Sequence, residues 1–127
     1  MEVRYSVSPS EARHMDTEAL RKQFFIGDLF RKDDIALLYA LDDRMLVIGA
    51  QPVSTEVTLE VGPEITGADF FLERRELGLI NLGGSGTVCV ESESYTLAKG
   101  EMLYVGRGSK EIRFSTDSRN DPPRFYG

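Results

Sequence analysis

The fold is decided by Phe70-Phe71-Leu72-Glu73-Arg74-Arg75-Glu76-Leu77-Gly78-Leu79-Ile80-Asn81-Leu82-Gly83-Gly84-Ser85-Gly86 and, further on, by Gly100-Glu101-Met102-Leu103-Tyr104-Val105-Gly106-Arg107-Gly108. Apolar runs at Leu77–Leu82 and Gly86–Glu91 flank Gly83-Gly84-Ser85. Because glycine tolerates positive φ angles, this pattern predicts two strands joined as a β-hairpin. Met102–Val105 predicts another short strand, followed by a glycine turn.

Short strands are also predicted on both sides of this stretch. Upstream, Ile35–Leu41 and Met45–Ala50 are separated by the turn residues Asp42-Asp43-Arg44, and residues 57–61 alternate between apolar and polar. Downstream, residues 95–97 and 111–115 alternate in the same way. Closely spaced short strands predict an all-β barrel or sandwich. Near the N-terminus, Leu20 and Phe24 instead share one face of a predicted helix over Thr17–Phe25, capped by Asp16 or Thr17.

The length of 127 residues predicts a single domain. We expect an N-terminal arm with a helix over residues 1–30, a β-barrel over 31–116 and a linker-like tail over 117–127. The tail is polar and proline-rich before it stops at an aromatic pair, so we expect the natural protein to continue.

Composition limits the classes of partner. A net charge of −6 and a pI near 4.8 argue against nucleic acid and anionic membranes, which both need a clustered basic surface. No apolar run approaches the ~20 residues of a membrane helix. Cys89 is the single cysteine, so an intrachain disulfide is excluded and a cytoplasmic location is expected.

The unusual charge cluster is Glu73-Arg74-Arg75-Glu76. Arg74 or Arg75 could grip a substrate carboxylate while Glu73 or Glu76 acts as a base. The alternative is an ion-pair network that fixes the strand or an interface. Neighbouring strand residues point to opposite faces, so the four side chains cannot all serve one pocket. Nearby, Arg107 and Lys110 are interpreted as solvated loop charges, with a small basic mouth as the alternative.

A metal site is not predicted on this chain. Zinc needs about four converging N, S or O ligands, and the chain has a single histidine, His14, and a single cysteine, Cys89. His14 is expected at the surface or in an interface, and Cys89 is expected to be buried as a small apolar residue. Gly83–Gly86 lacks the Lys-Ser/Thr ending of a phosphate loop, and the pattern predicts no helix after it.

The two glycine-containing stretches resemble the cupin motifs. Six residues separate Glu76 from Gly83, as between the glutamate and the glycine turn of the first motif. Gly100-x5-Gly106-x-Gly108 is similar to the second motif, with Gly106 in place of proline. The motif histidines would fall within Asp69–Leu72 and at Glu111, where this sequence has none. The resemblance implies a cupin-like barrel, a double-stranded β-helix or jelly roll, without the usual metal ligands.

A more specific resemblance covers nearly the whole chain. Phe70–Gly86, Leu103–Glu111 and Asp16–Arg21 are similar to the N-terminal half of the 5-keto-4-deoxyuronate isomerase family. The resemblance implies a ketol-isomerase of pectin and uronate catabolism, built from two cupin-like halves, with zinc bound in the C-terminal half. No zinc ligand of the family maps onto this sequence.

Three hypotheses follow. The first is a metal-free N-terminal domain that packs on the zinc-bearing C-terminal cupin half or forms a homo-oligomer, and that is inactive alone. The second is a stand-alone metal-free cupin that binds a sugar acid or self-associates. The third is metal-free isomerase activity from Glu73 or Glu76.

Overall fold

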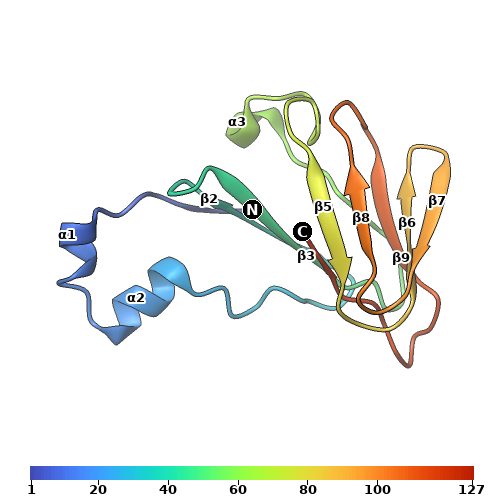
Figure 1. Ribbon diagram of the computed structural model, residues 1–127, viewed down its shortest axis with the longest axis horizontal. Coiled ribbons are helices and arrows are strands. Elements are labelled where there is room, and N and C mark those ends of the chain that lie inside the picture. The colour runs from blue at the N-terminus through green and yellow to red at the C-terminus, as the bar shows by residue number, and fades with distance from the viewer.

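Two β-sheets form the body of the protein in the computed structural model (Figure 1). The structure describes the backbone of residues 1–127 and every side chain except those at positions 64 and 65. The six-stranded sheet has the order β1-β2-β3-β10-β5-β8, and the four-stranded sheet has the order β4-β9-β6-β7. The strands are β1 (Glu2–Arg4), β2 (Ile35–Ala40), β3 (Met45–Ala50), β4 (Val57–Thr58), β5 (Leu77–Asn81), β6 (Gly86–Val90), β7 (Glu93–Leu97), β8 (Met102–Val105), β9 (Ile112–Thr116) and β10 (Phe125–Tyr126).

The core lies between the two sheets because side chains alternate along each strand. Leu77 and Leu79 of β5 face Val88 of β6 and Phe114 of β9, and all four are buried. Phe114 of β9 and Phe125 of β10 pack against each other between the two sheets, with their ring centroids 5.3 Å apart. The predicted all-β architecture is confirmed. The strand pairings leave both sheets with free edges, at β1 and β8 and at β4 and β7, so the sheets are not closed into a barrel.

The predicted hairpin at Gly83–Ser85 is wrong. β5 pairs with β8 and β10, whereas β6 pairs with β7 and β9, so the glycine segment carries the chain from one sheet to the other. The positive-φ glycines lie elsewhere, at Gly67, Gly100 and Gly108. A Cβ atom on Gly84 would lie 2.0 Å from the carbonyl oxygen of Asp121. Glycine is required here because the C-terminal segment passes in contact with the crossover.

Asn81 holds the same crossover in place from within the core. Its side-chain amide donates to the carbonyl oxygens of Gly84 and Leu97, at 2.7 and 2.8 Å. Its Oδ1 accepts the backbone N–H groups of Gly83 and Arg124, at 3.0 and 3.1 Å. The side chain is fully buried. Each of its donors and acceptor lone pairs therefore has a partner, which removes the usual penalty for burying an amide.

The predicted linker-like tail is also wrong at its end. Residues 125–126 form β10, which lies between β3 and β5 in the six-stranded sheet. Phe125 is opposite Ala50 on one side and Asn81 on the other, and it is fully buried. The polar and proline residues before it disguise this strand, since its pairing partners lie far away in the sequence.

The N-terminal arm extends to the left of the sheets in Figure 1. It contains α1 (Pro9–Ala12) and α2 (Thr17–Phe24). A third helix, α3 (Pro63–Thr66), follows β4 and precedes β5 along the chain. The predicted helix is confirmed with Asp16 as its N-cap, because Asp16 Oδ1 accepts the N–H of Ala19 at 2.8 Å. Arg4 of β1 fastens the other end of α2 by donating to the carbonyl oxygens of Gln23 and Phe25.

The helices are all short. Within the part of the chain whose side chains are described, none has the length and apolar composition needed to cross a membrane.

Candidate functional site

The charged cluster at 73–76 does not converge on one point. Glu73 Oε2 accepts the backbone N–H of Asp69 at 2.7 Å, and its other carboxylate oxygen lies 3.7 Å from Arg74 Nε. The side chain of Arg74 is 70% exposed, so this ion pair is weak. Arg75 reaches across to β2. Its Nη2 lies 3.4 Å from the hydroxyl of Tyr39, and its guanidinium carbon lies 5.6 Å from the centroid of that ring.

Glu76 points to the opposite side, the outer face of the six-stranded sheet. There it accepts a hydrogen bond from the Tyr104 hydroxyl, and this bond raises the pKa of the Tyr104 phenol above its ordinary value of 10.0. A carboxylate acceptor favours the protonated phenol, since ionisation would break the bond and place two negative charges together. Glu73 and Glu76 are therefore separated. Neither carboxylate is paired with Arg75, as would be expected if one glutamate acted as the base while the arginine held the carboxylate of the same substrate.

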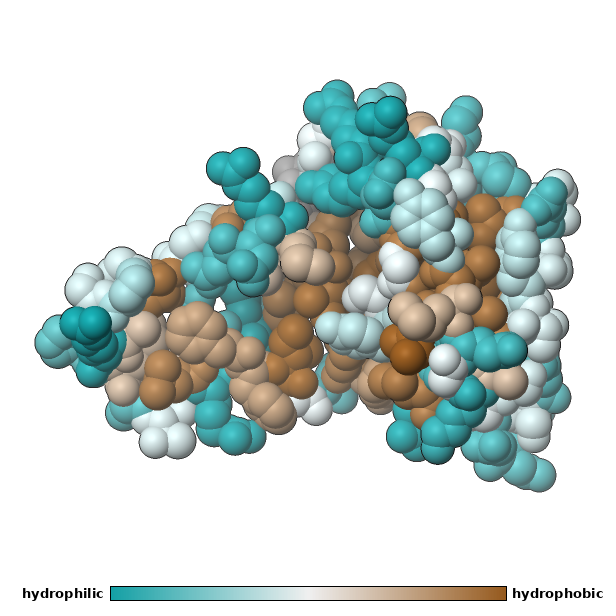
Figure 2. All heavy atoms as spheres, in the orientation of Figure 1, coloured by the Kyte–Doolittle hydropathy of each residue, from teal (hydrophilic) through white to brown (hydrophobic). Residues whose placement is uncertain are grey.

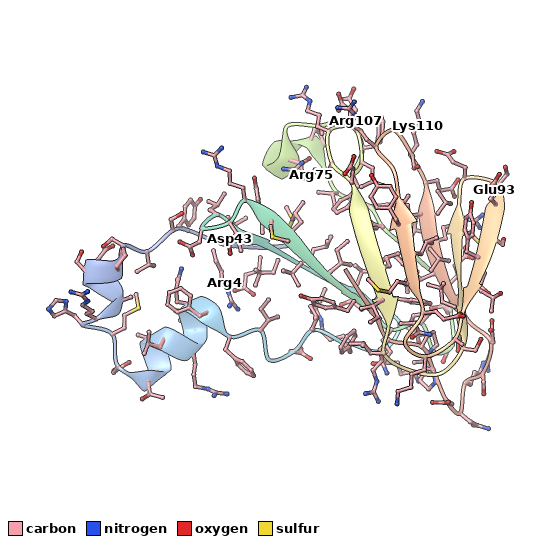
Figure 3. All side chains as sticks on the ribbon, in the orientation of Figure 1. Arg4, Asp43, Arg75, Glu93, Arg107 and Lys110 are labelled. Carbon is pink, nitrogen blue, oxygen red and sulfur yellow. The ribbon has the colours of Figure 1, made fainter. Side chains whose placement is uncertain are left out.

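Basic side chains gather at one end of the sheets, where Figure 3 shows Arg75, Arg107 and Lys110. The two loops that carry them are joined by a hydrogen bond of 2.8 Å from Gly108 N–H to the carbonyl oxygen of Leu72. Lys110 Nζ lies 5.8 Å from the centroid of the Phe70 ring. Beside it is a shallow pocket of about 340 Å³ whose lining includes Lys110, Asp69 and Glu60. Acidic side chains thus share the pocket wall with the lysine, which weakens it as a site for an anionic sugar acid.

The single histidine and the single cysteine, which could supply nitrogen and sulfur ligands to a metal, lie far apart in the structure. His14 is exposed on the arm, with Nδ1 2.7 Å from the carbonyl oxygen of Ser10. Cys89 is half-buried on the outer face of the four-stranded sheet, where Sγ lies 3.3 Å from Ser94 Oγ. The predicted burial of Cys89 is wrong, because Val88 and Val90 take the inward positions of β6. Among the described side chains, no group of three His, Cys, Asp or Glu residues could hold a metal ion. The described side chains therefore do not fit a zinc site.

The sequence analysis missed an apolar surface on the six-stranded sheet, which we call the open face. It consists of outward-facing residues of β5, β8 and β10: Gly78, Ile80, Met102, Tyr104 and Tyr126. Met102 is 72% exposed, Tyr104 66% and Tyr126 42%. Figure 2 shows brown, apolar atoms gathered on this side of the molecule, over β5 and β8 and along the arm. The available signal was Met102-Leu103-Tyr104-Val105, whose unbroken apolar run is typical of a strand covered on both faces.

Comparisons with known proteins give sequence matches over almost the whole chain. No protein-family model matches the chain. It is 44% identical, over 99% of its length, to proteins from Yersinia pestis (strain Pestoides F) and Yersinia pseudotuberculosis (serotype O:1b). Both relatives are named 4-deoxy-L-threo-5-hexosulose-uronate ketol-isomerase. The chain covers 46% of each relative, so it spans about half their length, and the matched part is the N-terminal half.

Solved structures that resemble the chain include two cupins. One is a cupin-2 domain protein from Shewanella frigidimarina, with 13% identity and a TM-score of 0.45, covering 91% of this chain and 93% of that one. The other is a cupin protein from Bacteroides fragilis, with 17% identity and a TM-score of 0.45, covering 74% of this chain and 73% of that one.

Proposed function

We propose that this chain, homologous to the N-terminal half of the 4-deoxy-L-threo-5-hexosulose-uronate ketol-isomerases, is the metal-free N-terminal part of such an enzyme. The observation that carries the proposal is the identity of 44% over 99% of the chain. An identity at this level that runs from end to end favours common ancestry of the whole domain over a shared motif. In this proposal the enzyme acts in the cytoplasm on an uronate produced by pectin breakdown.

The role proposed for this half is structural. A ketol-isomerase moves a proton between adjacent carbons and stabilises an enediolate, which requires a metal or a converging acid and base. The described side chains supply no cluster of metal donors, and Glu73 and Glu76 are turned away from each other. We therefore assign the chemistry, with zinc as its metal, to the C-terminal half of the longer protein. This half would support that one or assemble the oligomer.

The deciding experiment is an intact-mass measurement of the protein from its native source, with metal analysis and an isomerase assay on the same sample. The proposal expects a mass more than twice 14.2 kDa, since the chain covers 46% of its relatives. It also expects about one zinc per chain and turnover of the keto-uronate.

A native mass of 14.2 kDa without zinc or turnover would overturn the proposal. The protein would then be a stand-alone metal-free cupin that binds a sugar acid or self-associates. Titration with a uronate, followed by calorimetry, would then distinguish these two roles.

A further inference from the structure

The outer faces of the two sheets differ in chemistry. On the four-stranded sheet the outward side chains are mostly hydroxyl or charged groups, among them Thr58, Thr87, Ser94, Thr96, Arg113 and Ser115. Thr87 and Thr96 hydrogen-bond across β6 and β7, and Arg113 pairs with Glu56 at 3.0 Å. Polar side chains of this kind can remain exposed to water, so the outer face of the four-stranded sheet needs no cover. The open face of the six-stranded sheet instead presents Ile80, Met102, Tyr104 and Tyr126, and such contiguous apolar area marks a binding surface.

Part of the same six-stranded face is already covered by the chain itself. Over β2 and β3 the arm lies so close that a Cβ atom on Gly49 would be 2.4 Å from Leu29 Cγ. Ala36 and Leu38, which face the arm, are only 7% and 4% exposed. The cover ends there, and the exposure of Tyr126, Tyr104 and Met102 begins at the next strands. The outer face therefore needs a second cover over β10, β5 and β8.

Two glycines lie in or beside the open face where no contact in the described part of the chain requires a glycine. A Cβ atom on Gly78 or on Gly106 would meet no described atom within 4 Å. Neither glycine has a left-handed φ angle. A glycine inside a strand costs about 0.5–1 kcal/mol relative to alanine, and often marks a place where another backbone approaches closely. At Gly78, opposite Tyr104, that approach would come from outside the described chain.

We infer that the open face is the docking surface for the C-terminal half of the same polypeptide. The inference rests on the proposed function, because that half is the part of the relatives that this chain does not span. A tethered half is present at an effective concentration on the order of millimolar, which free second copies do not reach. Each copy also carries a net charge of −6, so two copies repel one another.

Hydroxyl-radical footprinting, read by mass spectrometry, tests the inference on the isolated 127-residue chain and on the complete native protein. Met102 and Tyr104 are reactive probes on the open face, and Tyr95, 37% exposed on β7 of the other sheet, is the internal control. We expect oxidation of Met102 and Tyr104 to fall about tenfold in the complete protein, because interface cores exclude water. Tyr95 should change less than about twofold.

Four outcomes are distinguishable when mass and isomerase turnover are measured on the same samples. Protection with turnover supports both the inference and the proposed function. Turnover with Met102 and Tyr104 unprotected overturns the docking surface and leaves the function standing. Protection without turnover supports the docking surface and overturns the function. Protection that appears in the isolated chain at rising concentration, or a native mass of 14.2 kDa, overturns the C-terminal half as the occupant.

A pair of variants checks the same surface without depending on loss of fold. Gly78→Lys fills the space that the partner would need, while in the isolated chain a Cβ atom at this position meets no described atom within 4 Å. Thr96→Lys is the matched control on the outer face of the four-stranded sheet. We expect Gly78→Lys to raise Met102 oxidation in the complete protein about fivefold or more, as for loss of an interface core contact. Equal effects of the two substitutions would overturn the inference.

Discussion

Asp33 shows how one side chain sets a local structure and makes it sensitive to acid. Its φ of 55° lies in the left-handed region, which aspartate tolerates better than most residues. Its Oδ1 accepts the backbone N–H groups of Ser54, Val53 and Thr55, at 2.6, 2.8 and 3.1 Å. The bonds from Ser54 and then Val53 contribute most to lowering the pKa of Asp33 from 3.8 to about 2. The segment between β3 and β4 is thus held by an ionised carboxylate.

The consequence for stability has a defined sign. Because the pKa of Asp33 is lower in the folded protein, its stabilising contribution is present above pH 3.8 and is lost as pH falls toward about 2. Asp33→Asn keeps the left-handed preference but removes this titration. We expect the free energy of unfolding of Asp33→Asn to fall less steeply than that of the parent between these pH values. Urea denaturation at several pH values measures it, and identical slopes would contradict it.

Glu76 allows a second test on the isolated chain. Glu76→Gln removes the negative charge beside Tyr104, so the pKa of the Tyr104 phenol should fall back toward 10.0. Ring resonances followed by NMR through an alkaline titration report this residue separately from the other tyrosines. An unchanged pKa would show that Glu76 does not reach Tyr104. In the complete protein, a loss of turnover of about a hundredfold would instead revive Glu76 as a general base.

For single residues, the sequence predicts the face of a strand to which a side chain points better than it predicts which residue that side chain contacts. Residues 73–76 lie in the turn and loop before β5 rather than in a strand, and their side chains still lie on different sides. Alternation along β6 could have placed Cys89 outward, opposite to Val88 and Val90. The contact between Arg75 and Tyr39 could not be predicted, because the two residues are 36 positions apart and meet only when β2 and β5 enter one sheet.

Two glycines in neighbouring elements should respond to alanine in opposite ways. In Gly84→Ala the new Cβ atom would collide with the backbone of Asp121, so we expect a loss of about 1–3 kcal/mol in the free energy of unfolding. In Gly78→Ala the new atom enters open space in a strand, so we expect a gain of about 0.5–1 kcal/mol. Urea denaturation of both variants measures the difference, and a shared sign would contradict the account of the crossover.

The arm depends on Arg4. A helix of 8 residues is marginal alone, and α2 has no buried residue to hold it. Figure 3 shows Arg4 lying between β1 and α2, where it donates to the carbonyl oxygens of Gln23 and Phe25. We expect Arg4→Met to release the helix at a cost of about 1 kcal/mol, or roughly fivefold faster amide exchange over Thr17–Phe24. Lys22→Met, an exposed position on the same helix, is the control and should leave exchange unchanged.

Elements were largely predictable, whereas their pairing was not. The strands at 35–40, 45–50 and 102–105 and the helix from Thr17 follow from local alternation, spacing and capping. The glycines at Gly83–Gly86 mark a change of direction, but a turn signal does not say whether the next strand pairs with the last one or joins the other sheet. That choice depends on the contact of Gly83 and Gly84 with residues 121–124, which lie more than 30 positions further along the chain.

The whole molecule depends on β10, which consists of two residues. Phe125 is fully buried against Phe114 and lies between β3 and β5, so it joins the two halves of the six-stranded sheet as well as the two sheets. We expect Phe125→Ala to lower the free energy of unfolding by about 3–5 kcal/mol. Phe24→Ala, at a side chain that is 53% exposed, should change it by less than about 0.5 kcal/mol. Equal effects in urea denaturation would contradict the importance of β10.

The position of β10 also has a consequence for synthesis on the ribosome. The chain leaves the ribosome from its N-terminus, so β3 and β5 emerge long before the strand that must lie between them. Until Phe125 emerges, both strands expose unpaired backbone edges and the apolar side of a half-built sheet, which are features that promote aggregation. Folding of this domain during translation is therefore delayed to its last residues, and a nascent chain stalled before Pro122 would be a substrate for chaperones.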